Sequence, residues 1–286
     1  MTVTRRRRLP VRALGASAAG AVILIAAVAA PLVSADPVPV TPTHPSTLMP
    51  SAPVTTAARP TTVRDQLLRL ADRLAAVPDD AHPGPYSYVR IWHWARASTV
   101  LARFESERWR HPDGSGVIIE RRAADRPLLT RRPGGDELKV FDKAEPTRET
   151  YTPGRLPPAL PEPIPTDTAE LIERMGTTAP PEAGPTALLA ATANINRSQY
   201  LDLHRRAAIL RVLATIPTLR YDGEAADITG RPGFSVSLNA GGSTTTLTFD
   251  RVTGALLAYE EALNTAPASL FQYELYEHGR QARPAE

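Results

Sequence analysis

The feature that most constrains this chain is an uncharged, almost wholly apolar run from Ala13 to Val33. The run is 21 residues long, and about 20 apolar residues in a helix are enough to cross the hydrocarbon layer of a bilayer. Arginines stand directly before it, and positive flanks stay on the cytoplasmic side. We therefore expect a cytoplasmic basic tail at residues 1–12, a transmembrane helix or signal anchor at 13–35, and export of everything that follows.

A cleavable signal peptide is the alternative reading of the same run. Val33, Ser34 and Ala35 place small residues where a signal peptidase reads them. Cleavage after Ala35 would give a secreted protein, and retention would give a single-pass protein of the cell membrane with its carboxyl-terminal domain outside. Both alternatives place the rest of the chain outside the cytoplasm.

Residues 36–61 are rich in Pro, Ser and Thr and show no apolar period. Proline-rich chain is extended and stiff, at about 3.1 Å per residue. We expect a stalk here that holds a single extracytoplasmic α+β domain, residues 62–286, away from the membrane.

Charge and cysteine content exclude several classes of protein. The chain has 33 basic and 30 acidic residues, and five of the arginines lie in the first 12 positions, which leaves 28 basic against 30 acidic residues in the remainder. Because the chain after residue 12 has no excess of positive charge, nucleic acid is not expected as a partner. Cysteine is absent, so disulfides, thiolate metal sites and cysteine nucleophiles are excluded.

Patterns of apolar residues predict the elements of the domain. Thr62 and Asp65 form a capping-box pattern ahead of Leu67, Leu70 and Leu74, which predicts a helix that ends before Pro78. Short β-branched and aromatic segments predict strands at 86–94, 99–110, 116–122, 127–132 and 137–141. Proline density predicts a surface loop at 151–165. Helices are expected at 166–176, 185–197 and 198–217, and strands at 219–230, 233–239, 244–250, 254–263 and 271–277.

Two glycine motifs predict turns between the last strands. In the sequence GRPG, Pro232 fixes φ and Gly233 permits the positive φ of a type II turn. In FDRVTG, Asp250 caps a hairpin turn and Gly254 takes the left-handed position. The order of helix, meander, helices and second meander is that of an α+β protein rather than of a parallel doubly wound sheet.

The carboxyl-terminal region resembles a known group of proteins. HRRAAILRVLATIPTLRYDGEAADITGRPGFSVSL followed by LTFDRVTGALLAYEE is similar to an uncharacterised family of actinobacterial membrane-tethered exported proteins, often found near extracytoplasmic-function sigma factors. More loosely, the exported part is similar to the half-barrel of periplasmic lipoprotein carriers and of an envelope-stress sensor, which bind acyl chains. This implies a curved antiparallel sheet with helices packed in its concavity.

The sequence shows no motif of a catalytic or metal site. Its six histidines include no pair at i, i+4 and no HExxH, and GxSxG and SxxK are absent. Glu105 and Glu107 share a strand face with Arg103, which favours a charge-paired strand over a catalytic carboxylate pair. We expect no enzyme activity, no metal and no cofactor.

One aromatic strand is the candidate ligand site. Tyr86, Tyr88, Trp92 and Trp94 alternate onto one face, while Val89 and Ile91 lie on the other. Aromatics on one face favour a ligand groove there. The alternative is ordinary core formed with Phe104 and Trp109.

These observations predict a non-enzymatic extracytoplasmic sensor or carrier. Its expected partners are the cell membrane and either a lipid-like ligand or an envelope-stress signalling protein. The alternatives are a passive cell-surface interaction domain and an envelope hydrolase with dispersed catalytic residues.

Overall fold

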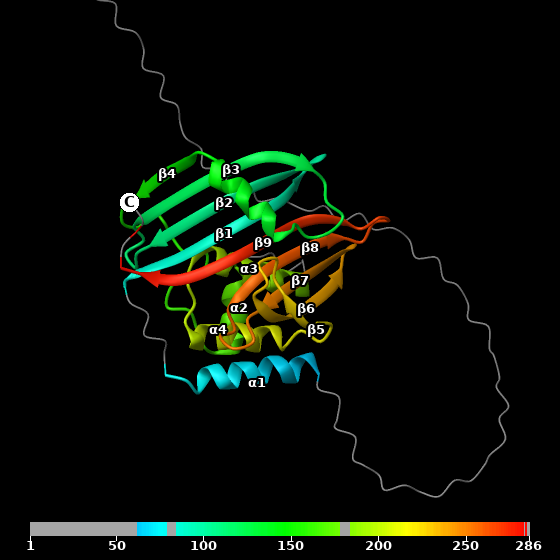
Figure 1. Cartoon of the computed structure of the whole chain (residues 1–286). Helices are drawn as coiled ribbons and strands as arrows, with labels where there is room; N and C mark the ends of the chain where they lie inside the picture. Colours follow the sequence, from blue (N-terminus) through cyan, green and yellow to red (C-terminus); the bar gives the residue numbers. More distant parts are fainter. Residues whose placement is uncertain (1–61, 79–83, 178–183, 283, 285–286) are drawn as a thin grey trace, which may run out of the picture. The chain divides into compact units, whose positions relative to one another are not determined.

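A computed structural model describes residues 62–78, 84–177, 184–282 and 284 (Figure 1). The expected basic tail at 1–12, hydrophobic segment at 13–35 and stalk at 36–61 lie outside these residues. Among the described helices, none is both long and apolar enough to cross a membrane. Residues 53–286 form one compact unit. The fold described below is that of the described residues within this unit.

A nine-stranded sheet is the centre of this unit, and all of its neighbouring strands are antiparallel (Figure 1). The strand order is β4-β3-β2-β1-β9-β8-β7-β6-β5, so the sheet is open, with β4 and β5 at its edges. The strands are β1 (Tyr86–Ala97), β2 (Val100–Arg110), β3 (Gly116–Pro127), β4 (Pro146–Tyr151), β5 (Arg220–Ala226), β6 (Pro232–Ala240), β7 (Ser243–Phe249), β8 (Leu256–Leu263) and β9 (Ser269–Gln281).

Two meanders, β1 to β4 and β5 to β9, meet where β1 pairs with β9. Between them in sequence come α2 (Thr168–Gly176), α3 (Pro185–Ser198) and α4 (Leu203–Leu213). The expected α+β class with an antiparallel sheet is therefore confirmed.

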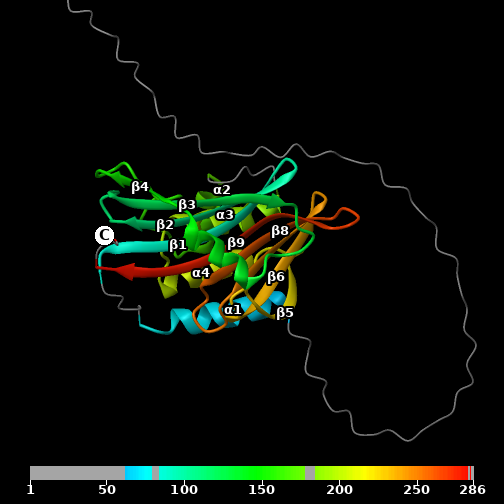
Figure 2. The ribbon, with the colours of Figure 1, turned by 45° about the horizontal axis from the view of Figure 1, so that its top comes forward.

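The first helix, α1 (Val63–Ala75), begins as its sequence predicts. The Asp65 amide donates to Thr62 Oγ1 at 3.1 Å, and the Thr62 amide donates to Asp65 Oδ2 at 3.1 Å. This reciprocal cap satisfies amides that the first turn leaves free. Leu67, Leu70 and Leu74 are buried on one side of α1, which packs against α4 (Figures 1 and 2).

The two faces of the sheet have different neighbours. The helix-covered face carries Val89, Ile91 and Tyr276, which share one core cluster with helix residues such as Leu189 and Leu210. Figures 1 and 2 show α2, α3 and α4 on this side. The opposite face carries Trp94 and Tyr273, which pack with Phe141 of the 3-10 helix η1 (Gly135–Lys143).

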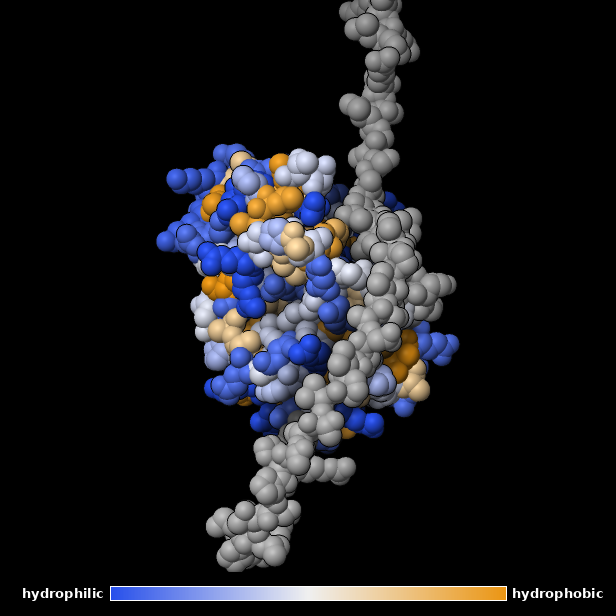
Figure 3. Space-filling view, turned by 90° about the vertical axis from the view of Figure 1, so that its right-hand side faces the viewer, coloured by the Kyte–Doolittle hydropathy of each residue, from blue (hydrophilic) through white to orange (hydrophobic). Residues whose placement is uncertain are grey.

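Hydrophobic side chains are scattered thinly over the surface. Among the described residues, the exposed large hydrophobics are Val77, Tyr221 and Val252. Figure 3 shows one side of the molecule, where hydrophobic atoms lie in small separate patches among hydrophilic ones. Large contiguous apolar patches are the usual mark of protein docking surfaces, and this side shows none among the described residues.

Between β3 and α2 two predicted strands were wrong, and the predicted surface loop at 151–165 is irregular as expected but only partly at the surface. Strand β3 ends at Pro127, so the strand expected at 127–132 does not form, and the strand expected at 137–141 is part of η1. The proline-rich segment expected at the surface buries Leu156, Leu160 and Ile164. The missed strand, β4, is a polar edge strand that begins with Pro146, and an edge strand needs no buried side chains.

The two turn motifs had different outcomes. Asp250 Oδ1 accepts the amides of Val252 at 2.8 Å and Thr253 at 2.6 Å, and Gly254 has φ 64°, as predicted. In GRPG the residue with positive φ is Gly230, at 85°, and Gly233 lies inside β6. A Cβ on Gly233 would lie 2.4 Å from the Phe249 carbonyl oxygen, so Gly233 serves close strand packing rather than a turn.

Candidate functional site

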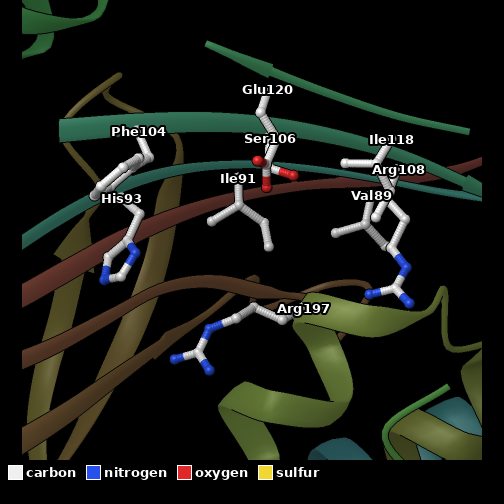
Figure 4. Close-up of a pocket in the computed structure, with 9 residues that line it drawn as sticks. All are labelled: Val89, Ile91, His93, Phe104, Ser106, Arg108, Ile118, Glu120 and Arg197. Carbon is white, nitrogen blue, oxygen red and sulfur yellow. The ribbon is translucent and has the colours of Figure 1, made fainter. Parts of the chain in front are cut away.

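A pocket of about 270 Å³ lies on the helix-covered face, between the first three strands and α3 (Figure 4). Strands β1 to β3 form its floor and α3 contributes a side chain from the other side. It is lined by Val89, Ile91, His93, Phe104, Ser106, Arg108, Ile118, Glu120 and Arg197.

The pocket floor combines hydrophobic side chains with Ser106 and Glu120, which lie beside Ile91 (Figure 4), and strand register sets this arrangement. Alternate side chains of a strand share a face, and the pairs Ile91 with Ser106 and Arg108 with Ile118 bring neighbouring strands into line. Val89, Ile91 and Ile118 form a hydrophobic surface, and Phe104 closes it at the end near His93 (Figure 4).

One end of the pocket is a buried polar cluster centred on Glu274 of β9. The Arg197 Nε atom donates to both carboxylate oxygens of Glu274 at 2.9 Å, and its Nη2 lies 2.6 Å from Oε1. Gln272 Nε2 and the Tyr276 hydroxyl also donate to this carboxylate. Glu274 is 0% exposed, so a buried charge here depends on these donors.

The cluster fixes the protonation states of its members. Burial disfavours the charge on Glu274, but the positive charge of Arg197 and the hydrogen bonds from Arg197 and Tyr276 outweigh it, so the pKa of Glu274 is lowered. Burial, with the positive charge of Arg197, lowers the pKa of His93 although Glu274 opposes this. His93 is therefore neutral at pH 7. Its Nε2 lies 3.5 Å from Glu274 Oε1 and has no hydrogen-bond partner among the described residues.

The other end of the pocket holds Arg108, whose guanidinium points into the space between the sheet and α3 (Figure 4). Its Nη2 donates to the carbonyl oxygen of Pro157 at 3.1 Å, and its Nε is buried without a partner in the part of the chain that the structure describes. The pocket thus has hydrophobic side chains and the Glu120 carboxylate between a neutralised cluster and a cationic end.

The four aromatic residues singled out in the sequence lie on the opposite face of β1, and none of them lines the pocket. Tyr86 and Tyr88 pack beside Trp109, and Trp92 lies beside the cluster that contains Trp94. Whether this face binds a ligand stays a prediction.

Trp94 is enclosed by side chains from distant segments. It is 0% exposed and meets Phe141 and Tyr273 edge to face, with ring centroids 5.9 Å apart in each case. Trp92 is only partly buried, and the Arg90 guanidinium lies 4.4 Å from its ring centroid. The side chain of Trp92 is therefore the more accessible of the two tryptophans.

The charged residues of β2 form ion pairs on that opposite face. Glu105, only 2% exposed, pairs with Arg90 at 2.5 Å and Arg121 at 2.9 Å, and Arg121 also reaches Glu107 at 2.8 Å. The expected charge-paired strand is thus observed, although Arg103 pairs with Glu137 instead.

The described residues contain no group of three or more His, Asp or Glu side chains suited to a metal ion. Sequence reasoning missed the pocket residues Arg108 and Arg197. A weak signal was present for Arg197, which is the one charged residue of α3, but not for Arg108, because β2 carries several other charged residues.

Comparison with known proteins gives little further guidance. No protein-family model and no curated protein matches this chain. A solved structure titled "Crystal structure of MucB" is similar at 15% sequence identity and a TM-score of 0.31, covering 78% of this chain and 60% of that chain. This chain therefore spans less than two thirds of that protein's length. A likeness at this level carries no argument, so the functional proposal rests on the geometry above.

Proposed function

We propose that residues 62–286 form a non-enzymatic extracytoplasmic sensor or carrier domain that binds a lipid-like ligand in the pocket between β1–β3 and α3. The observation that carries this proposal is the pocket's composition, an apolar floor of Val89, Ile91 and Ile118 with a cationic group at one end. Apolar walls with few polar groups are the usual composition of small-molecule sites.

The arrangement of α3 supports a half-barrel with helices in its concavity. Helix α3 contacts β1 as well as β7 and β8, and in the sheet order β9 lies between β1 and that pair. A helix in the concavity of a half-barrel meets strands from both halves of the sheet, and α3 does so on the two sides of β9. The pocket lies beside this helix.

Binding is favoured over hydrolysis because the strongest acid and base candidates are already engaged. The Glu274 carboxylate accepts hydrogen bonds from Arg197, Gln272 and Tyr276. A carboxylate stabilised in this way is a poor proton acceptor. His93 Nε2 lies 3.5 Å from this same carboxylate, and burial lowers the pKa of His93.

Membrane tethering is part of the proposal and rests on the sequence. The basic residues ahead of the apolar run at 13–33 favour a cytoplasmic amino terminus. The resemblance of residues 204–261 to membrane-tethered exported proteins agrees with this topology. A ligand pocket on an anchored domain suits recognition of molecules that leave or enter the membrane.

The experiment fills the pocket without changing its charge. Ile118→Trp places a bulky ring on the pocket floor, and Val252→Trp is the matched control on a turn where Val252 is 71% exposed. Calorimetric titration uses the full-length chain in lipid nanodiscs with decanoate and decanol, and empty nanodiscs supply the blank. We expect Ile118→Trp to weaken binding at least tenfold and Val252→Trp to leave it unchanged. Absence of binding by the unchanged chain, or equal losses in both variants, would refute the proposal.

A further inference from the structure

Arg108 is a partly buried cation without a carboxylate partner. Among the contacts of the described residues, its guanidinium has one hydrogen bond, to the Pro157 carbonyl, and its Nε is buried and unsatisfied. Four arginines of the same part of the fold each have a carboxylate at 2.5 to 2.9 Å, namely Arg90, Arg110, Arg121 and Arg197. A buried charge without a counterion is unfavourable, and functional sites are where folds retain such groups.

The surroundings of Arg108 increase its demand for an anion. Burial, followed by the positive charge of Arg110, lowers the pKa of Arg108 to about 10. Its guanidinium remains protonated at pH 7, so it carries an incompletely solvated positive charge. An anion that enters the pocket would supply both the missing charge and an acceptor for Nε.

Glu120 restricts the kind of anion. This glutamate lines the same pocket and lies on β3 opposite Ser106, two residues from the pairing partner of Arg108. The Glu120 carboxylate repels each negative charge of a ligand, so a single negative charge is favoured over a double one. A carboxylate fits this balance better than a phosphate monoester.

The apolar floor begins next to Arg108 and runs away from it. From Val89 to His93 the floor follows four residues of β1, a length of about 13 Å. The volume of about 270 Å³ equals roughly nine water volumes at ~30 Å³ each. The pocket therefore has room for a short extended chain lying over Val89 and Ile91 toward Phe104.

We infer that the ligand is a monoanionic amphiphile, a medium-chain carboxylate in its simplest form, whose head group binds Arg108 while its chain covers the floor of Val89, Ile91 and Ile118. This inference rests on the proposed function and adds the chemical class of the ligand and the residue that selects it.

The test compares head groups on one chain length, with the full-length protein in nanodiscs and calorimetric titration. The probes are decanoate, decanol, decyl phosphate and acetate. We expect decanoate to bind at least tenfold more tightly than decanol and more tightly than decyl phosphate, and acetate not to bind. Arg108→Gln should abolish the preference for decanoate over decanol without weakening decanol. Arg69→Gln, the same change on the exposed side of α1, should preserve the preference.

The outcomes separate this inference from the proposed function. Equal affinity for decanoate and decanol leaves a lipid-binding pocket but overturns the role of Arg108. Acetate binding as tightly as decanoate points to a small-anion site and overturns the amphiphile. Equal weakening of both ten-carbon ligands by Arg108→Gln assigns that residue to structure only. Absence of binding by all probes refutes both proposals, and the comparison of probes on the unchanged chain holds even where the variant does not fold.

Discussion

Arg197 and Glu274 lie 77 positions apart in the chain, yet the Arg197 Nε atom is 2.9 Å from both carboxylate oxygens of Glu274. This pair joins α3 to β9 on the helix-covered face of the sheet. Arg197 of this pair also lines the pocket, together with His93. The helix therefore has a fixed position over the sheet, with the pocket held open beside it.

Removal of the Glu274 charge should destabilise the fold strongly. Glu274→Gln leaves Arg197 without its counterion inside the protein, and breaking one partner of a buried pair costs about 3 to 5 kcal/mol. We expect a loss of that size in the free energy of unfolding, measured by urea titration. Glu224→Gln, which breaks an exposed pair with Arg251, should cost less than about 1 kcal/mol. Equal losses of stability in the two variants would mean that another carboxylate neutralises Arg197 in Glu274→Gln.

Stability should fall as the pH drops below about 6.5, because of His278. Burial, followed by the charge of Arg206 and opposed by the Asn196 carbonyl, lowers the pKa of His278 to about 3. A depressed folded-state pKa means that the unfolded chain binds the proton first. The contribution of neutral His278 to the free energy of unfolding is complete above the unfolded pKa of about 6.5. It is lost progressively as the pH falls toward the folded-state pKa.

The measurement for His278 is the urea midpoint between pH 7 and pH 4. We expect His278 to lower the free energy of unfolding by on the order of 1 kcal/mol for each pH unit of acidification. His278→Gln should remove this slope because glutamine does not titrate. His93, whose pKa is also lowered, will retain part of the slope. An unchanged slope in His278→Gln would show that this histidine has the same pKa in the folded and the unfolded chain.

The two tryptophans of β1 should respond differently to truncation. Trp94→Ala empties an enclosed site between Phe141 and Tyr273, and such changes cost about 3 to 5 kcal/mol. Trp92→Ala removes a partly exposed ring and its contact with Arg90, which we expect to cost roughly 1 kcal/mol. Decanoate binding should survive Trp92→Ala, since the pocket lies on the other face. A tenfold loss of binding without loss of stability would place the ligand on the aromatic face.

The proposed topology has a direct test. Protease added to intact cells with permeabilised walls should digest the domain after Thr62 while a tag on residues 1–12 stays protected. Amino-terminal sequencing of the mature protein then distinguishes anchor from signal peptide, because a terminus at Asp36 would show cleavage after Ala35. Protection of the domain would contradict export.

Much of the fold was predictable because its signals are local. The cap of α1 and the alternation of β1 each depend on residues within one element, and both formed as expected. The strand expected at 137–141 failed because ELKVF contributes one buried anchor, Phe141, which a 3-10 turn presents as well as a strand does. The proline-rich segment was misjudged because its leucines reach the core through non-periodic backbone.

The pocket was beyond sequence reasoning for a different reason. Alternation along β1 correctly separated Trp92 and Trp94 from Val89 and Ile91, but it could not show which face α3 covers. That choice depends on the contact of Arg197 with Glu274 and on the order of strands in the sheet. Neither is a property of any short segment.

The pairing of β1 with β9 has a consequence for how the chain reaches its native state. The two central strands, Tyr86–Ala97 and Ser269–Gln281, are the first and last strands of the sheet in sequence. Until the final strand is available, β1–β4 and β5–β8 remain two separate half-sheets with open inner edges. Contacts between such distant segments form slowly because a long loop must close first. A chain that emerges amino end first, from a ribosome or a translocation channel, therefore cannot complete its sheet until β9 has appeared.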